Sequence, residues 1–71
     1  MPTAKLLVHD LDSADAERRL ARALEGMPGV FGVVASCREH CVEVDFEDDE
    51  VTVEQLVSAA NAAGFRATLA G

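Results

Sequence analysis

The residues best suited to chemistry in this chain are two cysteines and a histidine close together in sequence, Cys37, His40 and Cys41. Thiolates select soft metals, and imidazole suits zinc and copper. The three side chains are therefore appropriate ligands for Cu(I), Zn(II) or Hg(II). Their Cys-x-x-His-Cys spacing matches no zinc finger known to us, and a tetrahedral site would need a fourth ligand.

His9 is the fourth candidate ligand. It lies near the end of a predicted strand, residues 5–10, in which Leu6 and Val8 point to one face and Leu7 and His9 to the other. Directly opposed residues on neighbouring strands lie about 4.5–5.5 Å apart. If this strand neighbours the one that begins near Cys41, His9 and Cys41 can share a metal. The predicted metal site therefore comprises Cys37, Cys41, His40 and His9, with His40 contributed by the turn.

A regular hairpin would separate the two thiols. A two-residue turn at positions 39–40 would place Cys37 opposite Val42 and Cys41 opposite Arg38. Cys37 would then point toward the core and Cys41 toward the other face of the sheet. Both chelation and an intrachain disulfide would be strained in that geometry. A bulge near the turn could bring the thiols together.

Two other interpretations of these cysteines stay open. Cys37 can be a small buried hydrophobe, with Cys41 and His40 as incidental turn residues. Alternatively, an exposed Cys41 can join two copies of the chain or sense oxidation, although acidic surroundings disfavour a thiolate there.

Hydrophobic spacing and end signals predict the elements that position these residues. A helix capped by Asp12 or Ser13 continues to about Gly26. Thr52 and Gln55 form a capping box for a second helix that ends at Gly64. Alternating apolar residues predict the strands, which are residues 5–10, 30–37, 42–46 and 65–69. The acidic segment 47–50 reads as a solvated loop, because it lacks the spaced ligands of a calcium site.

The order strand, helix, strand, strand, helix, strand predicts an α+β fold. With right-handed crossovers it gives a ferredoxin-like βαββαβ sandwich, a four-stranded antiparallel sheet with both helices on one face. The fourth strand should pair with the first, the first with the third, and the third with the second. The first loop, the hairpin turn and the loop before Phe65 should then lie at one end of the sheet.

These residues resemble the heavy-metal-associated domain family, which comprises ferredoxin-like copper and mercury carriers and the N-terminal modules of metal-pumping ATPases. The resemblance covers nearly the whole chain. It rests on mostly fold-making positions, namely Leu20, Ala23, Leu24 and Met27-Pro28-Gly29-Val30, the pattern Val33, Ala35, Cys37 and Val42, Val44, Phe46, and Leu56, Ala60, Ala63, Gly64, Phe65.

The family's metal-binding signature, Gly-Met-x-Cys-x-x-Cys, aligns without a gap on residues 10–16. Leu11 takes the methionine position, whereas Ser13 and Ala16 take the two cysteine positions. A hydroxyl is a poor ligand for a soft metal, and a methyl group is none. The family's usual two-thiolate site therefore cannot form in this loop, which directs attention to the hairpin.

Composition narrows the partners. Six Lys and Arg against thirteen Asp and Glu give a formal charge of −7, so nucleic acid is excluded as a partner. No apolar run is long enough for a membrane helix or a signal peptide, so we expect one domain, residues 1–71, in the cytoplasm. No phosphate-binding glycine loop, nucleophile elbow or acid–base pair is present, so we expect no enzyme.

Two functions follow from these observations. The first is a metallochaperone-like domain that binds a soft metal at a site relocated to the hairpin, with a metal-transporting ATPase as the partner that the resemblance implies. The second is a metal-free interaction module that docks or self-associates through the open sheet face, where Leu7 and Val34 lie beside Glu43 and Asp45.

Overall fold

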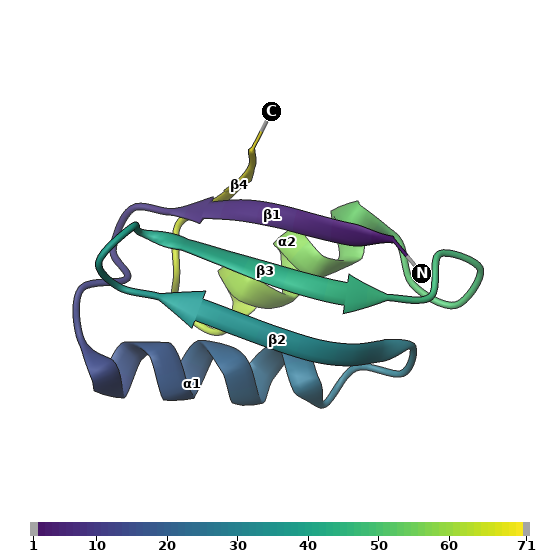
Figure 1. Cartoon of the computed structure of the whole chain (residues 1–71), viewed down its shortest axis with the longest axis horizontal. Coiled ribbons are helices and arrows are strands. Elements are labelled where there is room, and N and C mark those ends of the chain that lie inside the picture. Colours follow the sequence, from purple (N-terminus) through teal and green to yellow (C-terminus); the bar gives the residue numbers. More distant parts are fainter. Residues whose placement is uncertain (1, 71) are drawn as a thin grey trace.

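The computed structural model describes residues 2–70 and contains the predicted elements in the predicted order (Figure 1). They are β1 (Thr3–Val8), α1 (Ala14–Glu25), β2 (Val30–Ser36), β3 (Cys41–Phe46), α2 (Val53–Ala62) and β4 (Ala67–Leu69). The strands form one antiparallel sheet in the order β2-β3-β1-β4, and both helices cover the same face. The ferredoxin-like α+β sandwich is confirmed.

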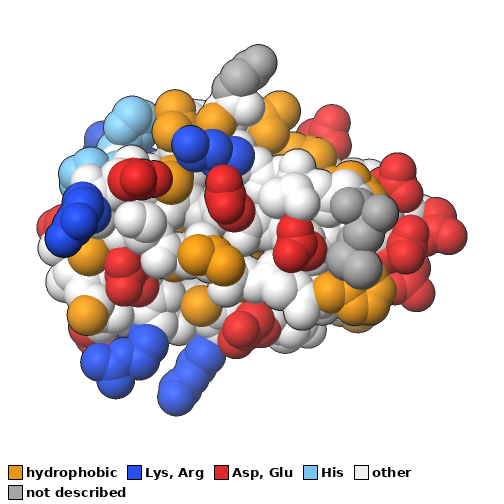
Figure 2. Space-filling model, in the orientation of Figure 1, with side chains coloured by type: hydrophobic (Ala, Val, Ile, Leu, Met, Phe, Trp, Pro, Cys, Tyr) orange, Lys and Arg blue, Asp and Glu red, His pale blue; other side chains and the backbone are white. Residues whose placement is uncertain are grey.

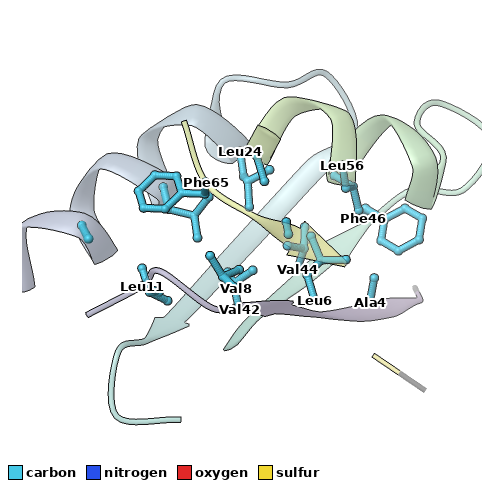
Figure 3. Packing of buried hydrophobic residues seen from close by; sticks show 14 of the residues in the cluster. Ala4, Leu6, Val8, Leu11, Leu24, Val42, Val44, Phe46, Leu56 and Phe65 are labelled. Carbon is cyan, nitrogen blue, oxygen red and sulfur yellow. The ribbon is translucent and has the colours of Figure 1, made fainter. Parts of the chain in front are cut away.

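The core lies between the sheet and the helices. Alternate residues of β1 and β3 point into it, among them Leu6, Val8 and Val42, and Leu24 and Leu56 pack on them from the helices (Figure 3). All five side chains are completely buried. The alternation of apolar and polar residues that predicted β1 and β3 therefore also identifies their buried side chains correctly.

Local signals fix the helix ends. The Ser13 hydroxyl accepts a hydrogen bond of 3.1 Å from the Ala16 amide and caps α1. Thr52 and Gln55 form the predicted capping box at α2, with reciprocal bonds of 3.2 and 2.8 Å. Gly29 has φ of +90°, and a Cβ there would lie 2.8 Å from that of Glu50, so this turn requires glycine.

The hairpin register differs from the predicted one by two residues. Ser36 pairs with Cys41 and Ala35 with Val42, so residues 37–40 form a four-residue loop rather than a two-residue turn. The Ser36 hydroxyl accepts a bond of 3.3 Å from the Glu39 amide, and His40 adopts a left-handed φ of 55°. These local contacts close the longer loop. A register shift of two residues leaves each side chain on the same face of the sheet, so Cys37 and Cys41 still point to opposite sides.

Candidate metal site at the hairpin end of the sheet

Three loops meet at the end of the sheet that carries the candidate ligands. The Val8 amide donates to the His40 carbonyl at 2.7 Å, and the His9 amide donates to the Arg66 carbonyl at 3.3 Å. The Asp10 carboxylate accepts from the Arg66 amide at 2.9 Å. Figure 2 shows the histidine side chains gathered at this end. The predicted meeting of the first loop, the hairpin loop and the loop before β4 is confirmed.

Cys41 is the best enclosed of the candidate ligands. As the first residue of β3 it pairs with Leu7 and Ser36, on the face of the sheet away from the helices. Only 4% of its surface is exposed, so the expectation of an exposed thiol is wrong. The thiol lies 3.7 Å from the Glu39 carboxylate, to which it donates. Burial, with some help from Glu39, raises the pKa of the Cys41 thiol.

Cys37 lies on the other side of the sheet. It is half-buried and packs against the core, and its amide donates a hydrogen bond of 2.6 Å to the Glu17 carboxylate of α1. A hydrogen bond from the thiol to the same carboxylate is the main cause that raises the pKa of Cys37. Glu17 therefore holds Cys37 protonated and turned toward α1.

His9 and His40 are both exposed. The register places Leu7 rather than His9 directly opposite Cys41, which corrects the expected pairing. His9 lies two residues beyond Leu7, just past the end of β1, and so at the same end of the sheet as Cys41.

The structure does not gather three of the four predicted ligands at coordinating distance. Within residues 2–70, the single group of three or more possible metal-binding side chains with ligand atoms within 4.8 Å of one another is Glu47, Asp48 and Asp49. These carboxylates follow β3, at the opposite end of the sheet from Cys41. Asp48 and Asp49 are exposed and Glu47 is half-buried, which agrees with the solvated loop expected from the sequence.

The residues of the loop between β1 and α1, and of the first turn of α1, have structural roles. Ser13 caps α1, and Ala16 is 5% exposed within the core. Leu11 is completely buried. The loop between β1 and α1 therefore begins a helix and contributes to the core.

Glu17, which links α1 to the hairpin loop, is not among the residues that the sequence pattern indicates. The backbone hydrogen bond from Cys37 lowers the pKa of this carboxyl. The signal in the sequence was an acidic residue in the first turn of a helix, where it is usually explained by the helix dipole. Its partner, 20 residues away, is brought close only by the fold.

We expect the hydrogen bond between Glu17 and the Cys37 amide to make the free energy of unfolding depend on pH in the acid range. The pKa of Glu17 is lower in the folded chain than in the unfolded chain. Glu17 therefore stabilises the fold above about pH 4.3, and this stabilisation is lost as the pH falls through the folded pKa. Glu17→Gln should therefore lower the urea midpoint at neutral pH and differ less from wild type in acid. Glu25→Gln, at the exposed end of α1, is the matched control. An equal difference at every pH would contradict this role.

No protein-family model matches this chain, and no curated protein matches it by sequence. Solved structures do match it in fold. A copper-binding domain from HMA7, a P-type ATPase, superposes with a TM-score of 0.96 at 22% identity, covering 100% of this chain and 96% of that one.

Two further solved structures match over nearly the whole chain. Oxidised MerP from Ralstonia metallidurans CH34 gives a TM-score of 0.93 at 21% identity, covering 99% of this chain and 97% of MerP. The CopZ metallochaperone gives 0.90 at 21% identity, covering 94% of this chain and 100% of CopZ. At these identities the likeness establishes the shared fold.

Proposed function

We propose that this chain is a soft-metal-binding domain whose site is centred on Cys41, with His9 and His40 as imidazole ligands. The observation that carries the proposal is the placement of the Cys41 thiol, on a rigid strand at the loop end where both histidine-bearing segments meet. Support comes from the fold, because its solved neighbours include a copper-binding ATPase domain and the CopZ metallochaperone.

The number of available ligands favours Cu(I) or Hg(II). Structural zinc sites need four ligands, whereas these soft ions accept two or three. Cys41 and one imidazole are enough for such a site. Cys37, in the loop that precedes Cys41, carries the second thiol, and it can enter the coordination only when the loop releases it from Glu17.

The setting proposed for this activity is the cytoplasm, with a metal-transporting ATPase as the partner that receives the ion. In residues 2–70 no helix has the length and apolar character needed to cross a membrane.

Metal affinity should rise with pH. The pKa of Cys41 is raised, so its thiol is protonated at neutral pH and must lose a proton to bind the ion. One released proton corresponds to about a tenfold gain in apparent affinity per pH unit, until the thiol pKa is reached. Competition titrations from pH 6 to 8 measure this slope, and a flat profile would argue against a thiolate ligand.

The test of the function is anaerobic titration of the reduced protein with Cu(I), Zn(II) and Hg(II) against a competing chelator. We expect one Cu(I) or Hg(II) per chain or per dimer, bound more tightly than about 1 μM, and weaker Zn(II). Weak binding of all three ions would leave the fold without its metal function.

A metal-free interaction module is the second candidate, because the open sheet face exposes apolar side chains. Leu7 is 38% exposed, Val34 67% and Phe31, which the sequence did not single out, 60%. Sedimentation of the metal-free protein tests self-association through this face. A dimer that Val34→Arg dissociates would favour this function, and a monomer would restrict it to other partners.

A further inference from the structure

The outer edge of β4 presents free backbone groups. Within residues 2–70, β4 pairs only with β1 and so ends the sheet. The Arg66 carbonyl accepts from the His9 amide, just past the end of β1, and the Ala70 amide donates to the Lys5 carbonyl of β1 at 2.9 Å. Because backbone groups alternate in direction along a strand, the amide and carbonyl of Leu69 point to the outer edge. They are available to another strand.

The N-terminal end of the same edge, at Ala67, is already covered. The Ala67 amide donates to the Asn61 side chain of α2 at 3.1 Å, as expected for a residue that points away from β1. An added strand would therefore pair with the Leu69 end of β4, together with the Ala67 carbonyl. This restricts both the length and the register of any segment that binds there.

An apolar groove runs beside this edge. It measures about 370 Å³ and lies between α2 and β4, lined by Val53, Glu54, Val57, Ala67, Thr68 and Leu69. Leu69 is in register with the buried Leu6, which places its side chain on the helix side of the sheet, yet 56% of it is exposed. The free backbone groups and the unfilled groove are thus adjacent.

We propose that this groove binds an extended cationic peptide, which adds a fifth strand alongside β4. Alternate apolar side chains of the peptide would enter the groove over Val57 and Leu69, and a Lys or Arg would face Glu54. The net charge of −7 favours a basic peptide and opposes a second copy of the chain. This surface is independent of the proposed metal site.

The probe is a fluorescein-labelled peptide, Lys-Leu-Thr-Leu-Lys, measured by fluorescence anisotropy with the metal-free protein. A contact of this size should bind with a dissociation constant of about 10–500 μM. Val57→Arg, which fills the groove and repels the peptide, should weaken binding at least about tenfold. Val34→Arg makes the same charge change on the open face, and it should weaken binding less than about threefold.

A second measurement separates strand addition from simple charge attraction and does not depend on how the variants fold. Methylating the backbone nitrogens of the peptide's two leucines removes the donors that a fifth strand needs, and we expect at least about tenfold weaker binding. Equal binding of the methylated peptide, equal effects of the two arginine variants, or no binding at about 1 mM would each overturn the proposal. A dimer that Val57→Arg dissociates would also overturn it and assign the groove to a second copy.

Discussion

Replacing Leu6 with alanine is expected to lower the free energy of unfolding by about 3 kcal/mol. Leu6 is completely buried at the centre of β1, which lies between β3 and β4. The substitution removes apolar contacts and leaves a cavity that a four-stranded sheet cannot easily close. A domain of this size has a total stability of about 5 kcal/mol, so most of it would be lost.

The adjacent Leu7 provides the matched control, because it has the same side chain in the same strand but is 38% exposed on the open face. Leu7→Ala should cost less than about 1 kcal/mol. Urea unfolding followed by circular dichroism measures both variants. Equal losses for the two variants would mean that the core does not lie between the sheet and the helices.

Replacing Cys41 with serine is expected to weaken the binding of Cu(I) or Hg(II) at least about tenfold, because it removes the one thiolate that the proposed site depends on. The change is nearly isosteric, so the fold should persist, which circular dichroism checks. Anaerobic chelator competition measures the affinity.

Cys37→Ser is the control for this prediction. The Cys37 thiol is hydrogen-bonded to Glu17 and packs against the core, so we expect metal affinity to fall less than about threefold. Similar losses for both variants would mean that the loop rearranges to bring the two thiols together. An unchanged affinity in Cys41→Ser would remove Cys41 from the site.

The sequence predicted the fold well because its signals are local and agree with one another. The alternation in β1 and β3, the cap at Ser13 and the capping box at Thr52 each specify one element. Right-handed connection of those elements leaves one simple sheet order, and the structure has it. Strand ends moved by two residues at most, as expected where hydrogen bonding rather than hydrophobicity sets the limit.

The hairpin loop could not be predicted in the same way. No Asn-Gly or Asp-Gly pair marks the turn, and His40 takes a left-handed conformation that glycine or asparagine would normally indicate. Without the loop length, the partners of Cys41 across the sheet were also unknown. The burial of Cys41 depends on these partners, so the sequence predicted the correct face of the sheet for Cys41 but the wrong exposure.

X-ray absorption at the copper edge of the Cu(I)-loaded protein tests the central claim most directly, because it identifies the atoms bound to the ion. The proposed site predicts one sulfur and one or two imidazole nitrogens, with the sulfur signal lost in Cys41→Ser. Oxygen ligands alone would place the ion on carboxylates such as Glu47, Asp48 and Asp49, and that result would contradict a soft-metal site at Cys41.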